Sequence, residues 1–177
     1  MINRPSWAEK TTVLQDYYDD EWGFEEHDDQ KLFEILCMQS YQIGLSRQTV
    51  LNKRDGFRHY FCEYRIDKVA NMGDAHVKLM LINPEVIRNR MKLEVTINNA
   101  KIILEMRENG LTFNNYMWGF VEFQPCKLKV SADERLPSQT RLSAKIAKQM
   151  HKDGFKLVGP VTIYSFMLAA GMIDARL

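Results

Sequence analysis

The chain has 177 residues, of which 45% are apolar and 27% charged, and its formal net charge is +1. This composition is typical of a soluble globular protein, and no apolar run approaches the roughly 18–20 residues of a membrane span, which excludes a transmembrane protein. No signal-peptide pattern opens the chain, so we expect a cytoplasmic protein. The length suits one domain with its own core, and we expect residues 1–177 to form a single domain.

Apolar residues recur at helical spacing through most of the chain, which predicts an all-α fold. In chain order, helices are predicted over residues 29–41, 46–54, 67–72, 74–82, 84–109, 141–152 and 161–172. Asp28 or Asp29 can cap the first helix and Ser46 the second. Asn83-Pro84-Glu85 is a strong helix-start signal, because it combines a cap residue, a first-turn proline and an acidic residue. Residues 123–139 lack periodicity and predict an irregular loop with at most a short extended piece.

Cysteine and histidine give no sign of a metal site. The cysteines, Cys37, Cys62 and Cys126, are odd in number and form no CxxC pair, so we expect reduced thiols. The four histidines show no metal-ligand spacing. We therefore expect no metal and no cofactor.

Charge is distributed unevenly. Residues 19–34 hold eight acidic residues against one lysine, whereas residues 141–159 hold five basic residues against one aspartate. A basic segment on a nearly neutral chain can meet a polyanion, but it can equally be the solvated face of a helix. Charge alone leaves both interpretations open.

The last two predicted helices form a unit of the helix-hairpin-helix type over residues 141–172. They are joined by Gly154-Phe-Lys-Leu-Val-Gly159, and Pro160 enters the second helix. Glycines let backbone N–H groups approach a phosphate, and the dipole at the helix N-terminus favours negative charge. Ordinary αα-hairpins also contain such glycines, so the motif alone is a weak signal.

Five segments in a fixed order carry a resemblance to a known family. They are Tyr17-Tyr-Asp-Asp-Glu-Trp-Gly23, Lys31-Leu-Phe-Glu34, Gly44-Leu-Ser46, Thr49-Val-Leu-Asn-Lys-Arg54 and the stretch from Gly154 to Gly171. Together they resemble the type I DNA-3-methyladenine glycosylases of the helix-hairpin-helix superfamily, and the resemblance runs from Trp7 to Gly171. It implies a compact helical domain with a base-binding pocket between helical lobes.

The resemblance also implies an activity. Such enzymes hydrolyse the N-glycosidic bond of 3-methyladenine in double-stranded DNA after flipping the damaged nucleotide into an aromatic pocket. The methylated base is cationic and already a good leaving group, so aromatic faces and a carboxylate supply recognition with little acid–base machinery. We expect a monofunctional N-glycosylase that acts as a monomer on duplex DNA carrying an alkylated base.

Particular residues match the family's functional positions. The pocket aromatics correspond to Trp7, Tyr17 and Trp22, for which the alternative is a place in the core. Leu45 matches the apolar wedge that enters the base stack, although it could also be a buried leucine between helices. The remaining candidates for contact with DNA are Gln42 and Gly44 beside the wedge, and Gly154, Lys156 and Gly159 in the hairpin.

Several positions depart from the family. Gln39, the candidate catalytic residue, stands where the family has a pocket glutamate, and Arg47 and Leu14 stand where it has a tryptophan and a tyrosine. Glutamate-to-glutamine and tryptophan-to-arginine exchanges change the local formal charge from −1 to +1, the wrong direction for a cationic base. Gln39 can still accept a hydrogen bond, and Arg47 either faces the pocket or turns out to a phosphate.

The family's zinc site is altered too, because its ligand positions fall at Pro5, Tyr18 and Arg176. The leading hypothesis is a monofunctional glycosylase, for which Gln39 and Arg47 suggest reduced activity or a shifted, less cationic substrate. The alternative is a weak or silent homologue that binds damaged or distorted DNA, and a third is a protein that kept the fold without binding nucleic acid. The wedge, the hairpin glycines and the basic helix favour the first two.

Overall fold

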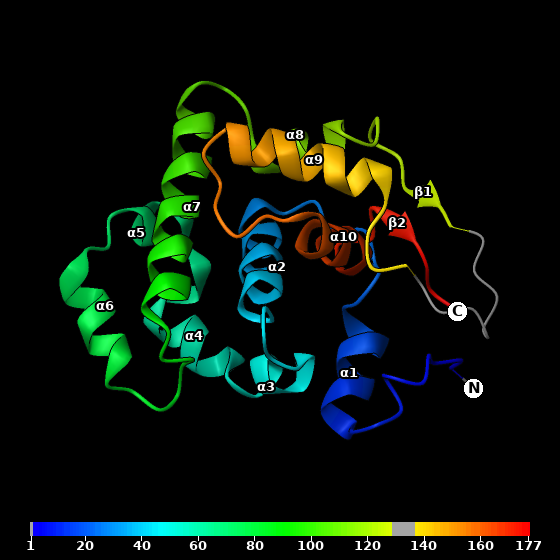
Figure 1. Ribbon diagram of the computed structural model, residues 1–177, viewed down its shortest axis with the longest axis horizontal. Coiled ribbons are helices and arrows are strands. Elements are labelled where there is room, and N and C mark those ends of the chain that lie inside the picture. Colours follow the sequence, from blue (N-terminus) through cyan, green and yellow to red (C-terminus); the bar gives the residue numbers. More distant parts are fainter. Residues whose placement is uncertain (1, 129–136) are drawn as a thin grey trace.

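The structure is a computed structural model that describes residues 2–128 and 137–177, and its regular elements are almost all helical (Figure 1). This confirms the predicted all-α fold. The α-helices are α1 (Thr12–Asp20), α2 (Asp29–Tyr41), α3 (Arg47–Asn52), α4 (Arg54–Tyr60), α5 (Ile66–Ala70), α6 (Asp74–Leu81), α7 (Arg90–Glu108), α8 (Phe113–Gly119), α9 (Arg141–Lys152) and α10 (Pro160–Ala169). A 3-10 turn, η1 (Cys62–Tyr64), follows α4, and the two-residue strands β1 (Cys126–Lys127) and β2 (Ile173–Asp174) pair in parallel.

Helix α2 is central, with α7 on one side and α10 on the other (Figure 1). Its N-cap is Asp28, whose side chain accepts a hydrogen bond from the Lys31 amide. Every residue from Leu36 to Tyr41 is buried. Because the C-terminal half of α2 is enclosed on all sides, it carries the polar side chain of Gln39 into the interior.

Helix α7 begins later than the sequence pattern predicts. Asn83-Pro84-Glu85 forms a turn in which the Asn83 side chain accepts a hydrogen bond from the Glu85 amide at 2.8 Å. The Glu85 carbonyl packs so closely on Gly56 that a Cβ there would lie 2.2 Å from it. The segment therefore stays non-helical, and α7 starts at Arg90 with Asn89 as its cap.

The sequence pattern missed the short helices α1, α4 and α8. These helices have too few turns to show an apolar period, and α1 is rich in tyrosine and aspartate. The irregular loop predicted over residues 123–139 lies partly outside the described residues. In its described part, β1 supplies the short extended piece.

Arg176 ties the C-terminal segment to α1. Its Nη1 donates to the carbonyls of Tyr18 at 2.6 Å and Trp22 at 2.5 Å, and its guanidinium stacks on the rings of Tyr18 and Phe24. Two of these residues, Tyr18 and Arg176, occupy zinc-ligand positions of the resembled family. The interactions are a cation–aromatic stack and charge-assisted hydrogen bonds, which join the C-terminal segment to α1.

Within residues 2–128 and 137–177, no three histidine, cysteine or acidic side chains cluster as metal ligands would. All three cysteines are free. None of the described helices is both long and apolar enough to cross a bilayer.

Candidate active site and DNA interface

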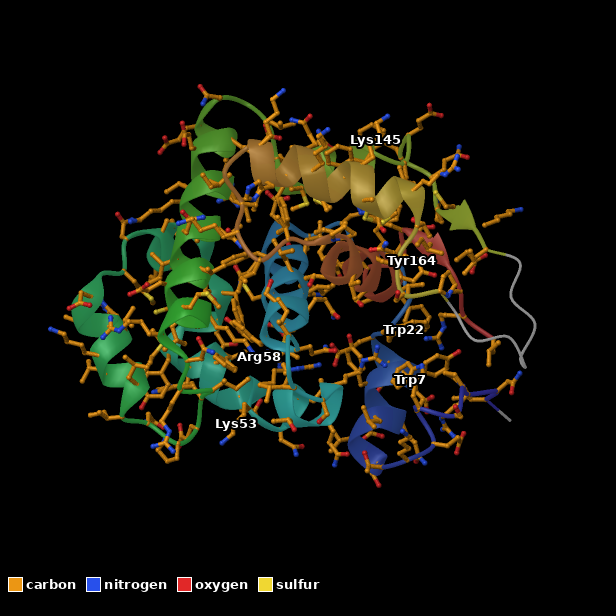
Figure 2. All side chains as sticks on the ribbon, in the orientation of Figure 1. Trp7, Trp22, Lys53, Arg58, Lys145 and Tyr164 are labelled. Carbon is orange, nitrogen blue, oxygen red and sulfur yellow. The ribbon has the colours of Figure 1, made fainter. Side chains whose placement is uncertain are left out.

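An aromatic cluster forms where the N-terminal segment packs on α1. The Trp7 ring centroid lies 6.5 Å from that of Tyr17, 5.7 Å from that of Tyr18 and 5.4 Å from that of Trp22, and Figure 2 shows Trp7 and Trp22 next to each other. Tyr18 stacks on Trp22 at 5.5 Å. Tyr17 and Trp22 are buried, whereas Trp7 is half-buried. The structure thus brings the three predicted pocket aromatics together and adds Tyr18 to them.

Gln39 lies on α2 beside this cluster with only 4% of its surface exposed. Its Oε1 accepts a hydrogen bond from Gln42 Nε2 at 3.4 Å. Burial raises the pKa of the Tyr17 phenol, while the charges of Arg47 and Arg54 and the neighbouring Gln39 amide oppose that rise. Tyr17 is therefore a neutral phenol in the physiological range, and Gln39 offers a polar edge beside it.

Arg47, the first residue of α3, turns inward. Its guanidinium carbon lies 4.0 Å from the Trp7 ring centroid, a cation–π contact. Burial lowers the pKa of Arg47, and its Nε is buried without a hydrogen-bond partner in the part of the chain that the structure describes. Of the two orientations that the sequence left open, Arg47 adopts the inward one, against the aromatic cluster. The guanidinium covers a face of Trp7 on which a base could stack.

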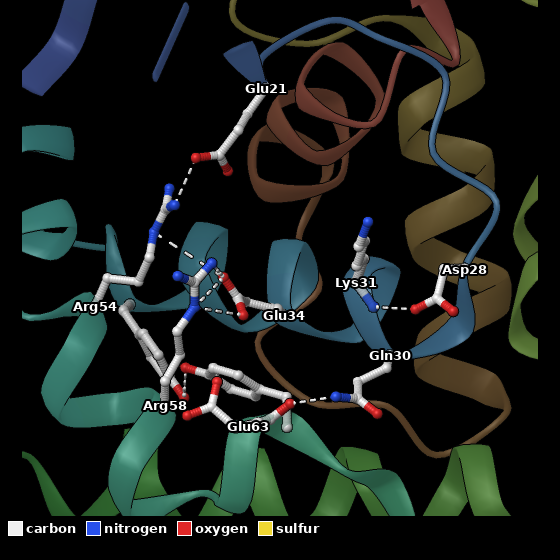
Figure 3. Close-up of polar contacts among 10 residues, drawn as sticks. Glu21, Asp28, Gln30, Lys31, Glu34, Arg54, Arg58 and Glu63 are labelled. Atoms are coloured by element: carbon white, nitrogen blue, oxygen red, sulfur yellow. Dashed lines mark hydrogen bonds and ion pairs between the residues drawn. The ribbon is translucent and has the colours of Figure 1, made fainter. Parts of the chain in front are cut away.

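A charged network lies beside Tyr17, and Figure 3 shows its arginine and glutamate side chains. Arg54 on α4 lies 5.6 Å from the Tyr17 ring centroid and donates to Glu21 at 2.6 Å. Its Nε is 4.0 Å from Glu34, which also accepts a bidentate hydrogen bond from Arg58. A cavity of about 280 Å³ opens beside this network. No sequence pattern pointed to these pairs, because α2 and α4 meet only in the fold.

The turn between α2 and α3 presents apolar side chains to solvent. Leu45 is 38% exposed and Ile43 is 44% exposed. Gly44 between them has φ of +78°, a left-handed conformation that favours glycine. Leu45 is therefore an exposed tip and not a leucine buried between helices. Ile43 is a second exposed apolar residue, which the sequence analysis missed. We call residues 42–45 the wedge turn.

In the turn between α9 and α10, some backbone amides donate hydrogen bonds to described residues and others, called the open amides below, do not. The amides of Gly154, Phe155 and Lys156 donate to His151, Met150 and the Asn99 side chain, respectively. By contrast, the amides of Leu157, Val158 and Gly159 have no acceptor within the described residues. These amides lead into the N-terminus of α10, where the helix dipole favours an anion.

The two hairpin glycines have different roles. Gly154 has φ of +102°, and a Cβ there would lie 2.9 Å from Ile102, so the fold itself requires glycine. Gly159 has an ordinary φ of −66°, and a Cβ there would meet nothing within 4 Å. Nothing inside the described protein requires glycine at 159, which leaves that backbone open to an approaching group. The Lys156 side chain is exposed nearby.

The wedge turn and the hairpin turn both lie at the C-terminal end of α2. Ser40 Oγ donates to the Leu157 carbonyl at 3.4 Å, two residues before the wedge turn begins. One end of one helix therefore gathers the buried Gln39, the exposed wedge residues and the open hairpin amides. A surface of this kind can contact an extended ligand at its backbone and enclose one of its units.

The chain is similar to known proteins along nearly its whole length. The methyladenine glycosylase family model matches residues 7–177. The chain is 37% identical over 177 residues to the DNA-3-methyladenine glycosylase of Haemophilus influenzae, covering 100% of this chain and 96% of that protein. It is 36% identical over 173 residues to DNA-3-methyladenine glycosylase 1 of Escherichia coli, covering 98% and 92%.

Solved structures show the same likeness. A crystal structure of 3-methyladenine DNA glycosylase I superposes with a TM-score of 0.95 at 36% identity, covering 99% of this chain and 96% of that one. The helix-hairpin-helix fold expected from the sequence is thereby confirmed. The chain belongs to the methyladenine glycosylase family.

Proposed function

We propose that this protein is a monofunctional DNA glycosylase that hydrolyses the N-glycosidic bond of 3-methyladenine, or of a related alkylated base, in duplex DNA. The observation that carries the proposal is the aromatic cluster of Trp7, Tyr17 and Trp22 beside Gln39, in a chain that matches the family along its length. Residues 1–177 would act as one domain and one monomer, because both turns and the aromatic cluster come from one chain. The cytoplasm is the proposed site of action.

The chemistry follows from the charge of the base. When the glycosidic bond of N3-methylated adenine breaks, its electron pair goes to the base, which leaves neutral, and the sugar carbon becomes cationic. Water adds to that carbon and releases a proton, which leaves an abasic site. The aromatic faces bind the flipped cationic base, and the Gln39 amide accepts a hydrogen bond from its exocyclic amine. Because the leaving group is already activated, no strong general acid is needed.

The surface contacts would be divided between two turns. Leu45 and Ile43, both exposed, would enter the base stack when the nucleotide flips, and Gln42 would lie beside the space that the nucleotide vacates. The open amides that end at Gly159, together with Lys156, would bind phosphates without regard to sequence. Both roles fit the open surroundings of Gly44 and Gly159, where a Cβ would have no atom of the described residues within 4 Å, apart from the chain neighbours.

A second function is favoured by Arg47. Its guanidinium lies over Trp7, where a cationic base would stack, and this arrangement suits a protein that binds distorted DNA without releasing the base. In that case the wedge and hairpin turns would be active and the aromatic cluster would not. Both functions involve binding to DNA, but only the glycosylase releases a free base.

The experiment that separates them is base release from methylated duplex DNA under single-turnover conditions, with the free base identified by chromatography and mass. Release of 3-methyladenine by the parent, and its loss in Trp22→Ala, supports the glycosylase. A Lys10→Ala variant, which changes an exposed residue, is the matched control. If the parent binds an abasic duplex tightly and releases no alkylated base above the control without protein, the binding function replaces the catalytic one.

A further inference from the structure

Helix α7 carries buried polar side chains that face the two turns described above. Lys92 is 6% exposed and Asn99 is 2% exposed. They lie two helical turns apart, about 10 Å along the axis. A buried ammonium group is costly, and an apolar side chain of similar size would often be as stable. Their presence therefore calls for an explanation beyond packing.

Lys92 is bonded to the start of the wedge turn. Its Nζ donates to the carbonyls of Tyr41 at 2.8 Å and Ile43 at 2.7 Å. Carbonyls at a helix C-terminus lack partners within the helix and carry the negative end of its dipole. A cation from α7 thus caps the end of α2 and holds the backbone from which Ile43 and Leu45 project.

Asn99 is bonded to the hairpin turn in two directions. Its Nδ2 donates to the Lys156 carbonyl at 3.1 Å, and its Oδ1 accepts from the Lys156 amide at 3.0 Å. The preceding residue, Asn98, donates to the Gly154 carbonyl at 3.1 Å. These bonds fix the residues just before the open amides, and they explain why the Lys156 amide is not itself available to a phosphate.

We propose that Lys92 and Asn99 are positioning residues that make α7 a rigid spacer, setting the distance between the wedge turn and the hairpin turn for simultaneous contact with DNA. This inference rests on the proposed glycosylase function. A duplex is itself stiff, so phosphate contact and wedge insertion must match in spacing. A misplacement of about 1 Å can cost up to about a hundredfold in rate.

The test uses Lys92→Met and Asn99→Leu, which remove the polar groups at similar volume, in the full chain. Thr96→Val is the matched control, because Thr96 is equally buried on the same helix but bonds the Tyr41 side chain and not a turn backbone. Three properties are measured for each variant: affinity for undamaged duplex, fluorescence of 2-aminopurine beside an abasic analogue, which reports unstacking, and release of 3-methyladenine.

We expect Lys92→Met to reduce base release by about tenfold while affinity for undamaged duplex changes by less than about twofold. Asn99→Leu should instead weaken binding to any duplex by about tenfold, since it releases the phosphate-binding turn. Thr96→Val should match the parent in all three measurements.

A double-variant cycle separates positioning from a general loss of stability. If Lys92 acts through the wedge, Lys92→Met should cost less than about twofold when Leu45 is already alanine. Additive losses in that cycle, or an unchanged duplex affinity in folded Asn99→Leu, would overturn the proposal. If Lys92→Met does not fold, Lys92→Gln keeps one donor and should lose part of the unstacking signal, so a full signal would also overturn it. The fluorescence and affinity measurements need no catalysis, so they remain decisive even if the parent releases no base.

Discussion

Replacing Arg47 by tryptophan should improve the binding of a flipped cationic base. Arg47 lies 4.0 Å from the Trp7 ring centroid, so a base stacked in its place would either displace the guanidinium or lie beside it. Two unit charges 4 Å apart repel by about 4 kcal/mol at an effective dielectric constant of about 20. Because both charges are delocalised and Arg47 is only partly buried, we take about 1 kcal/mol for repulsion.

Arg47 also denies the base a cation–π contact with the Trp7 face, which adds about 1 kcal/mol. The total is about 2 kcal/mol, or about thirtyfold in the affinity for the base. The repulsion disappears as the glycosidic bond breaks, because the base leaves neutral. Because the repulsion acts on the bound cation more than on the transition state, Arg47→Trp should lower the half-saturating enzyme concentration without raising the maximum rate. Adding Gln39→Glu should strengthen base binding further through a charge-assisted hydrogen bond.

The assay is single-turnover release of 3-methyladenine from methylated duplex over a series of enzyme concentrations. Arg47→Met is the matched control, because it removes the charge without adding an aromatic ring. We expect Arg47→Met to give part of the roughly thirtyfold gain in base binding and Arg47→Trp to give all of it. If both variants keep the parent's half-saturating concentration, Arg47 does not oppose the base, and the other aromatic faces suffice for so labile a bond.

Three further predictions concern the hairpin and the terminal segments. Lys156→Glu should weaken binding to all duplex sequences alike and reduce the salt dependence, as measured by fluorescence anisotropy, whereas loss at one sequence only would contradict phosphate contact. Arg176→Met should lower the free energy of unfolding by about 3 kcal/mol in urea, since two charge-assisted hydrogen bonds are lost, whereas the exposed control Arg107→Met should cost under about 1 kcal/mol. Hydrogen bonding to Arg4 lowers the pKa of Asp19, so the stability that this pair contributes is present above the ordinary carboxyl pKa of 3.8 and is lost as pH falls through the lowered value. Trp7 fluorescence should therefore shift only in that acid range. An Arg4→Met variant should lack the shift.

Cap residues in the sequence predicted correctly those helix ends that depend only on side chains within one or two helical turns. Asp28 and Ser46 are caps as expected, and α9 has the predicted bounds, because side-chain caps compete only with nearby backbone. The Asn83-Pro84-Glu85 signal failed because the same residues also form a turn, and a tertiary contact with Gly56 decided between the two.

The site was less accessible from the sequence. Its aromatic residues were named through a resemblance, since nothing in their spacing shows that Trp7 and Trp22 meet. The direction of Arg47 was open because both a ring face and a phosphate attract a guanidinium. Lys92 and Asn99 stood in a helix read as mostly core, and only the fold reveals that their partners are the backbones of two distant turns.

The contacts of Arg176 with Tyr18, Trp22 and Phe24, here called the clamp, affect the order of folding. It joins residues 158 positions apart in the chain, so the entropy of closing a very long loop must be offset before its hydrogen bonds can form. The α9–α10 pair, by contrast, rests on contacts between neighbouring segments and can form without it. We therefore expect Tyr18 and Trp22 to pack against Arg176 late, after the folding transition state. Substitutions in the clamp should accelerate unfolding and leave the folding rate almost unchanged.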